Sequence, residues 1–347
     1  PIITCDAHIG KPMLKLLHSI FGGREERGRY PASLIELATE RVVEGTDPRL
    51  RALSGLSRRL HDPIVRSIDH VIEVVRGIPG FLEVTAAAHG ADPRLGALFA
   101  SAESMFDILG RDQGLREYLE TGEGRVARRV VGLLMAERVE RNVLGMDLVG
   151  DQIRRDVAQV VVSFVAHRVL EPNVSEEEGR RQLMRRAFDF LLTQALNRIS
   201  EVKLERADLS RQRDLLQRKL SALEQGGWGF KALDPRHPDL ATLMAELDDV
   251  TAQLEALGPD QETLETHLGI VIEVLANPGQ HLWVEPVTLY LDAMNIVREP
   301  DNAAARRLDF MEFRGGRGQR AVTLPLAIQP DLLPPREDFL AALDRYY

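Results

Sequence analysis

The sequence predicts an α+β protein that is predominantly helical, with an N-terminal helical domain and a small antiparallel sheet interrupted by a long antiparallel coiled-coil hairpin. Leucines alternate at three- and four-residue spacing between residues 175 and 278, and alternating β-branched residues lie on both sides of that stretch. Helix-start signals recur before it. The predicted domains are a helical domain (1–156), a sheet domain with a C-terminal helix (157–174 and 279–347) and the hairpin insertion (175–278).

The second arm of the hairpin shows the clearest heptad pattern. Its seam consists of Leu240, Leu243, Leu247, Val250, Leu254 and Leu257, and the register resumes at Leu264, Leu268, Val271 and Leu275. The first arm repeats at Ile199, Val202, Leu209, Leu216, Leu220 and Leu223. Such a seam is typical of helices that pack as a coiled coil. Arg206 and Arg213 also fall on the first seam and weaken its pairing with the second arm. Because parts of the first arm are then imperfectly paired within one chain, the heptads also allow a homodimer.

The start of the first arm resembles a capping box. Ser175 is followed three residues later by Glu178, and each side chain can accept the other residue's free backbone N–H. Other helix starts use aspartate before proline, at Asp47, Asp62, Asp92 and Asp234. The carboxylate can cap a helix and the proline fits its first turn, so these positions predict helix starts.

Two of these starts belong to a short repeat. GTDPRLRAL at residues 45–53 and GADPRLGAL at residues 90–98 agree at seven of nine positions. Stacked helical repeats of the HEAT type need about three copies or more, so recurrence of one good cap explains the repeat better.

An amphipathic helix is predicted between Gly124 and Gly145. Its apolar side carries Val126, Val130, Leu133, Leu134 and Val143, and its arginines lie largely elsewhere. A basic amphipathic helix can bind a membrane or RNA, but Glu137 and Glu140 favour an ordinary solvated face.

The sheet is predicted to take one strand from before the hairpin and three from after it. The strands are Gln159–Leu170, a strand around Val287–Leu291, Leu308–Arg314 and Arg320–Gln329. Glycines at 315, 316 and 318 predict a tight turn between the last two. Pro286 and Pro325 should lie on edges or at strand starts, because proline cannot donate to a strand ladder. A short helix is expected from Glu337 to Tyr346.

Composition narrows the function classes. The chain of 347 residues has a formal net charge of −9, which argues against general binding to nucleic acid or anionic membranes. No run approaches the roughly 18 to 20 apolar residues that span a bilayer. Cys5 is the only cysteine, so an intrachain disulfide is excluded and a reducing cytoplasm is expected. The pattern predicts no cofactor.

The hairpin tip is the first candidate site. Residues 225–238 contain Trp228 and Phe230 next to glycines. Large aromatic side chains exposed on such a turn serve as anchors for a partner. The alternative is that both rings fold back and close the apolar end of the coiled coil.

The second candidate is a basic β-hairpin that could bind phosphates. It carries Arg314, Arg317 and Arg320, with Arg306 and Arg307 upstream and a further basic region at 180–186. Charges on edge strands also prevent aggregation, and the acidic chain as a whole favours that interpretation.

The third candidate is a metal site. His18, the adjacent His61 and Asp62, and a later aspartate such as Asp107 or Asp112 resemble the ligand order of metal-dependent HD-type phosphohydrolases. That resemblance implies a metal that activates water. However, Asp62 precedes a proline and fits a helix cap, and no P-loop, Gly-x-Ser-x-Gly or His-Glu-x-x-His motif occurs.

These patterns favour a non-enzymatic cytoplasmic interaction or scaffolding protein that uses its coiled-coil hairpin to bind a protein partner. The alternatives are a nucleic-acid-binding regulator that uses the arginine-rich β-hairpin and the metal-dependent phosphohydrolase. The absence of a convincing catalytic constellation and the length of the leucine seam decide the order of these hypotheses.

Overall fold

The computed structural model describes residues 30–149, 152–225, 240–256, 260–315, 318 and 320–335. The chain divides into two compact units, one formed by residues 1–67 and 189–278 and the other by residues 68–188 and 279–347. Helices α3 (Leu56–Arg76) and α9 (Glu176–Gln225) contribute residues to both units. The α+β class predicted from the sequence is confirmed.

The first unit is helical. Besides parts of α3 and α9, it contains α2 (Ala32–Gly45), the 3-10 helix η1 (Pro48–Ala52), α10 (Leu240–Ala256) and α11 (Asp260–Ala276). An ion pair between Arg41 and Asp189 joins α2 to α9. Ser67, the last α3 residue in this unit, donates to the carbonyl of Leu275 on α11 at 2.7 Å. These contacts join elements that are far apart in the sequence.

The second unit is built on a sheet. Its strands are β1 (Leu82–Glu83), β2 (Val130–Val149), β3 (Gln152–Asn173), β4 (Leu282–Leu291), β5 (Arg306–Gly315) and β6 (Arg320–Ile328). Five of them lie in the antiparallel order β3-β2-β6-β5-β4, and β1 pairs in parallel with β6. The antiparallel sheet is therefore confirmed, and it is larger than predicted because β1 and β2 join it.

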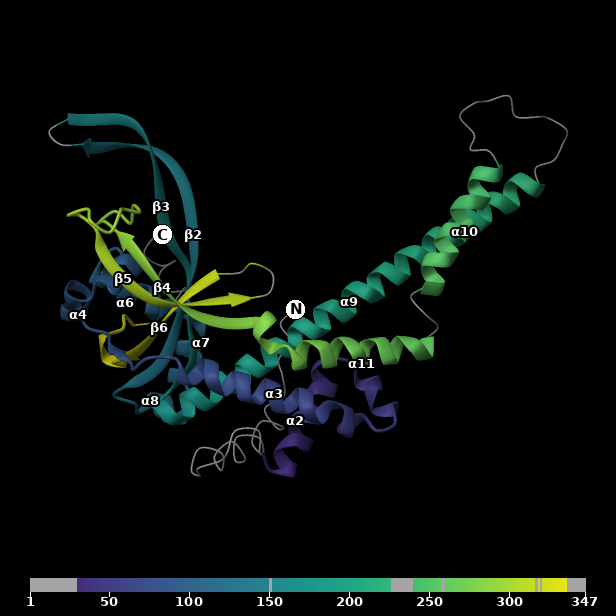
Figure 1. Cartoon of the computed structure of the whole chain (residues 1–347). Coiled ribbons are helices and arrows are strands. Elements are labelled where there is room, and N and C mark those ends of the chain that lie inside the picture. The colour runs from purple at the N-terminus through teal and green to yellow at the C-terminus, as the bar shows by residue number, and fades with distance from the viewer. Residues whose placement is uncertain are drawn as a thin grey trace, which may run out of the picture. The chain divides into compact units, whose positions relative to one another are not determined.

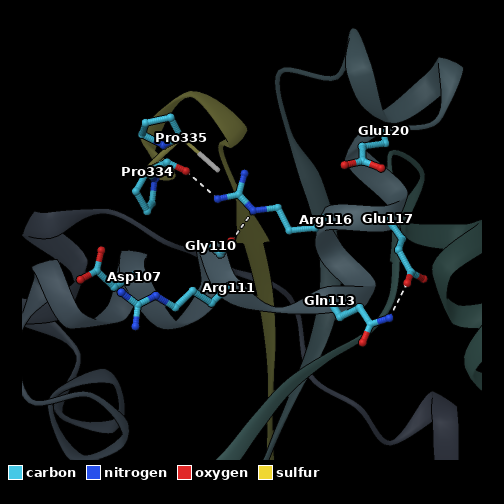
Figure 2. Close-up of a pocket in the computed structure, with 9 residues that line it drawn as sticks. All are labelled: Asp107, Gly110, Arg111, Gln113, Arg116, Glu117, Glu120, Pro334 and Pro335. Carbon is cyan, nitrogen blue, oxygen red and sulfur yellow. Dashed lines mark hydrogen bonds between the residues drawn. The ribbon is translucent and has the colours of Figure 1, made fainter. Parts of the chain in front are cut away.

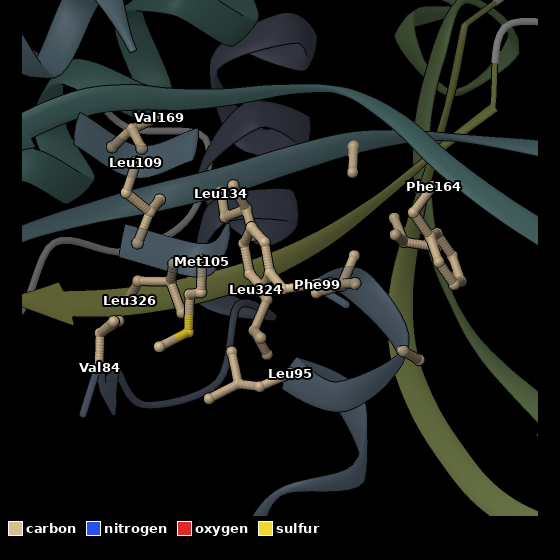
Figure 3. Packing of buried hydrophobic residues seen from close by; sticks show 14 of the residues in the cluster. Val84, Leu95, Phe99, Met105, Leu109, Leu134, Phe164, Val169, Leu324 and Leu326 are labelled. Carbon is tan, nitrogen blue, oxygen red and sulfur yellow. The ribbon is translucent and has the colours of Figure 1, made fainter. Parts of the chain in front are cut away.

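Short helices accompany the sheet, and some of them contribute to the core of this unit. They are α4 (Ala86–Ala91), α5 (Pro93–Leu98), α6 (Ala102–Arg111), α7 (Gln113–Leu119) and α8 (Gly122–Arg125), with the 3-10 helices η2 (Pro278–Gln280) and η3 (Pro330–Leu332). Figure 3 shows Leu95, Met105 and Leu109 from the helices gathered with Leu134 and Leu324 from the strands. Burial of these apolar side chains fixes the helices on the sheet.

Strands β2 and β3 extend beyond the rest of the sheet as a curved two-stranded ribbon (Figure 1). β2 pairs with β6 only over Val130–Glu137, whereas its pairing with β3 continues to Val149 opposite Gln152. Leu144 and Met146 on this ribbon are 73% and 65% exposed.

The helix predicted between Gly124 and Gly145 is wrong, because most of that stretch is strand β2. Val130, Val131, Leu133 and Leu134 are all buried. Since consecutive residues of a strand point to opposite faces, both faces of the sheet are covered here. Such a strand lacks the alternation of a half-exposed one, and its apolar run also fits one side of a helix.

Two predictions that involve prolines are also wrong: the helix start at Asp62 and the edge position of Pro325. α3 begins at Leu56 and contains Pro63 in its interior, so Asp62 does not start a helix. The buried residues Leu60 and Ile64 continue across the proline on one helix face, and their burial offsets its cost of about 3 kcal/mol.

Pro286 lies on the edge strand β4, as predicted, but Pro325 lies on the interior strand β6. On the side of β6 away from β2, pairing with β5 ends at Thr323 and pairing with β1 begins at Leu326. Pro325 therefore occupies a gap in the ladder, where a missing N–H is tolerated.

Two aspartate caps are confirmed. Asp47 accepts the backbone N–H of Arg49 before η1, and Asp92 accepts that of Arg94 before α5. In both copies of the nine-residue repeat the arginine side chain also donates to the aspartate. The repeat therefore encodes one local capping motif. Asp234 and the helix predicted at Glu337–Tyr346 lie outside the described residues.

The capping box at the start of α9 is only half formed. The hydroxyl of Ser175 accepts the backbone N–H of Glu178 at 3.3 Å. The backbone N–H of Ser175, however, donates to the side chain of Asn173, and the Glu178 carboxylate forms an ion pair with Arg181.

Candidate functional site

Helices α9 and α10 lie side by side (Figure 1). They pack against each other through leucine-rich faces. The contact consists of Leu209, Leu216 and Leu220 on α9 and Leu243, Leu247, Val250 and Leu254 on α10. All seven occupy seam positions of the predicted heptads, so the leucine spacing identified the contact face correctly. The 50 residues of α9 make a helix about 75 Å long, which presents a large surface outside this contact.

A second apolar stripe on α9 lies outside this contact. Leu204 and Leu215 are 61% and 54% exposed. They are eleven residues apart, which is close to three helical turns, so both side chains lie on one side of the helix. Asp208 and Arg211 form an ion pair between them. This stripe could not be predicted from the heptad pattern, because two leucines at an eleven-residue spacing do not form a heptad.

The aromatic residues of the predicted tip, Trp228 and Phe230, lie outside the described residues. The chain on either side of them belongs to α9, which ends at Gln225, and to α10, which begins at Leu240. Their role as partner anchors therefore stays a prediction.

Of the hairpin arginines proposed for phosphate binding, Arg314 is engaged within the protein. Arg314 forms ion pairs with Glu285 and Glu312, at 2.5 Å and 2.8 Å. Glu312 is completely buried and lies 2.9 Å from a guanidinium nitrogen of Arg138 on β2. Arg314 and Arg138 together neutralise the buried carboxylate of Glu312, so Arg314 has a structural role. Arg320 is exposed on β6, and Arg317 lies outside the described residues.

The basic region at 180–186 is engaged in the same way. Arg180 donates to the backbone carbonyls of Val75 and Ile78, each at 3.1 Å. Arg186 pairs with Glu171 at 2.6 Å. Arg314, Arg180 and Arg186 are therefore engaged in contacts within the protein.

The candidate metal ligands do not form a cluster in the described part of the chain. His61 lies 2.9 Å from the adjacent Asp62, and both side chains are exposed. His18 lies outside the described residues. Asp112 accepts two backbone N–H groups, from Leu115 and Val169. No group of three His, Cys, Asp or Glu side chains that could hold a metal is found among the residues that the structure describes.

An open groove of about 500 Å³ lies beside α6, α7 and the chain after η3 (Figure 2). It is lined by Asp107, Gly110, Arg111, Gln113, Arg116, Glu117, Glu120, Pro334 and Pro335. Figure 2 shows Arg116 reaching between Gly110 and the two prolines.

The polar groups of this groove mostly satisfy each other. Arg116 donates to the carbonyl of Gly110 and, at 2.5 Å, to that of Pro334. Gln113 donates to Glu117 at 2.6 Å. Arg116 thus fastens the chain after η3 to the start of α7.

Comparison of the chain with protein-family models, curated proteins and solved structures finds no match. Among the described residues, no helix has the length and apolar character required to cross a membrane.

Proposed function

We propose that the protein is a non-enzymatic interaction protein in which α9 and α10 form an antiparallel coiled-coil hairpin that binds a protein partner. The observation that supports this proposal best is the exposed stripe of Leu204 and Leu215 beside the leucine contact of the two helices. An apolar stripe on a long helix gives a partner helix a place to bury its own apolar side chains.

The partner is expected to be a helix with apolar residues at matching spacing. The ion pair of Asp208 and Arg211 between the leucines would orient such a helix by charge. Burying one leucine contributes about 1.5 to 3 kcal/mol, so two leucines can dominate a small interface.

The test compares proteins captured by the immobilised full chain and by its variants, with quantitative mass spectrometry of the recovered proteins. The double change Leu204→Ser and Leu215→Ser should lower recovery of a specific partner at least about tenfold, because a loss of 1.4 kcal/mol already has that effect. Val126→Ser is the matched control, since Val126 is an exposed apolar residue on the other unit. Equal recovery by the wild type and the double variant would reject the stripe as the binding surface.

A further variant separates the stripe from the hairpin tip. If Trp228→Ala with Phe230→Ala abolishes recovery while the leucine variant does not, the partner binds at the tip. Light scattering tests whether the partner is a second copy of the chain. In that case the wild type is a dimer and the double leucine variant is a monomer.

A further inference from the structure

A buried histidine connects three elements of the helical unit. His267 on α11 is completely buried, and its Nδ1 lies 2.9 Å from Oδ2 of Asp47, the residue that caps η1. The other ring nitrogen, Nε2, is also buried and has no hydrogen-bond partner in the described structure. Lys203 on α9 places its amino group 3.4 Å from the same Asp47 oxygen.

Asp47 holds its negative charge at this junction. Arg49 donates to it from the backbone N–H at 3.1 Å and from the guanidinium at 2.9 Å. These hydrogen bonds, led by that of the Arg49 side chain, hold the pKa of Asp47 well below its usual range despite burial. An ionised carboxylate only accepts hydrogen bonds, so Nδ1 of His267 carries the proton and Nε2 is the unprotonated nitrogen.

A second proton on His267 would be poorly accommodated. It would place an N–H at Nε2, where the described residues offer no acceptor, and a buried donor without an acceptor costs about 1 to 3 kcal/mol. Burial lowers the pKa of His267, and the positive charges of Lys203 and Arg49 act in the same direction. Asp47 opposes the shift but does not cancel it.

We propose that Asp47, His267 and Lys203 form an acid-sensitive latch that holds α11 and α9 at η1 when His267 is neutral and releases α11 when His267 binds a proton. The ionisable groups that act on the ring are Asp47 and Arg49 at η1 and Lys203 on α9. Two other contacts join α11 to α3, from Ser67 to Leu275 and from Arg59 to Glu265. Neither changes charge near neutral pH, because Arg59 lowers the pKa of Glu265 further below its ordinary value of 4.5.

The direction of the effect follows from linkage. The pKa of His267 lies below its ordinary value of 6.5 in the folded protein and returns to that value when α11 opens. The open state therefore binds more protons, and the latch loses stability as the pH falls below 6.5. For one histidine, the population of the open state rises by up to about tenfold between pH 7.5 and pH 5.5.

The experiment is hydrogen exchange of the full chain at both pH values, followed by mass spectrometry of α11 peptides and corrected for the intrinsic exchange rate. His267→Asn keeps a donor toward Asp47 but does not titrate. We expect opening of α11 to rise by up to about tenfold in the wild type and by less than about twofold in this variant. His61→Asn, which replaces an exposed histidine of the same unit, should behave as the wild type.

An equal acid response in the wild type and His267→Asn would overturn the latch, as would the lack of any response in the wild type. Lys203→Gln provides a second variant that does not disturb a buried side chain, since Lys203 is 46% exposed. It removes a charge that repels the protonated ring, so its acid response should be smaller than that of the wild type. A nuclear magnetic resonance titration of His267 with a midpoint at or above 6.5 would also reject the proposal.

Discussion

Single aspartates hold several turns of this protein by accepting backbone N–H groups. Asp92 accepts the N–H of Arg94 at 2.9 Å, and Asp292 accepts those of Met294 and Ile296 at 2.8 Å and 3.0 Å. A short carboxylate side chain reaches the backbone N–H groups that follow it, which explains why aspartate suits these positions. The Asp-Pro pairs predicted such caps correctly at Asp47 and Asp92, where the chain turns before a short helix.

Asp112 links a helix to the sheet, which makes its replacement costly. One of its oxygens accepts the N–H of Leu115 in α7 at 2.7 Å, and the other accepts the N–H of Val169 in β3 at 3.0 Å. Asp112→Ala removes a helix cap and a link between α7 and the sheet, so the free energy of unfolding should fall by about 2 to 3 kcal/mol. Urea denaturation measures this change.

Asp62→Ala is the control for that measurement. The Asp62 side chain is 85% exposed and contacts only the neighbouring ring of His61 among the described interactions. Its replacement should change the free energy of unfolding by no more than about 0.5 kcal/mol. If both variants lose the same stability, the two backbone contacts of Asp112 contribute nothing specific.

Ion pairs between buried residues that are distant in the sequence cannot be predicted from local residue patterns. Glu312 is fully buried between Arg138 and Arg314, which come from strands β2 and β5. The residue patterns predicted a helix around Arg138 and gave Arg314 as a candidate for phosphate binding, with an edge-strand charge as the favoured interpretation. Their true roles depend on strand pairing between residues more than 170 positions apart, as in the contact of Arg138 with Glu312. No local spacing encodes such a pair.

At the level of elements, two adjacent leucines of α9 provide a test of its packing. Leu216 is buried in the contact with α10, whereas Leu215 is 54% exposed. Leu216→Ala should destabilise the α9–α10 contact by about 2 to 4 kcal/mol, because it removes apolar contacts and leaves a cavity. Leu215→Ala should cost less than about 0.5 kcal/mol.

The measurement is hydrogen exchange of peptides from α10, which reports opening of this contact directly. Faster exchange in Leu216→Ala alone is the expected result. Similar exchange in the two variants would show that the leucine face does not hold α10. The same pair of variants is useful for partner capture, since only Leu215 belongs to the exposed stripe.

Element prediction succeeded where one face of a helix or strand is exposed. The residues around Val162 and Phe164 alternate and were correctly predicted as a strand, which became β3. The leucine spacing also identified the contact face of α9 and α10. Strand β2 was missed because Val130 to Leu134 is covered on both faces, which removes the alternation that identifies a strand.

For the whole molecule, the predicted domain boundaries followed changes of secondary-structure type along the chain. The compact units instead place residues 1–67 together with residues 189–278. Contacts between distant residues account for this grouping, such as Asp47 with His267 and Arg59 with Glu265. The sequence marks Asp47 as a cap and His267 as one residue of a helix, but nothing in either pattern indicates that the two meet.

The described part of each unit contains a histidine whose pKa is lowered, fully buried His267 in one and partly buried His167 in the other, and this predicts two separate responses to acid. His267 belongs to the helical unit, and His167 on β3 belongs to the sheet unit. Nε2 of His167 carries the proton and donates it to the carbonyl of Leu98 at 3.0 Å, because a carbonyl oxygen only accepts. The ring also stacks on Phe99. Burial lowers the pKa of His167 from 6.5, although the bond to Leu98 opposes the shift.

Both histidines therefore stabilise their units above about pH 6.5, and this stability decreases as the pH falls toward their lowered pKa values. His167→Gln retains a donor for Leu98 and should remove the acid response from β3 and α5 peptides in hydrogen exchange, while α11 peptides respond as in the wild type. His267→Asn should do the reverse. Every hydrogen-bond partner shown for either ring lies in that ring's own unit, so the two responses should be additive in the double variant. If either single variant changed the response of both units, this separation would be wrong.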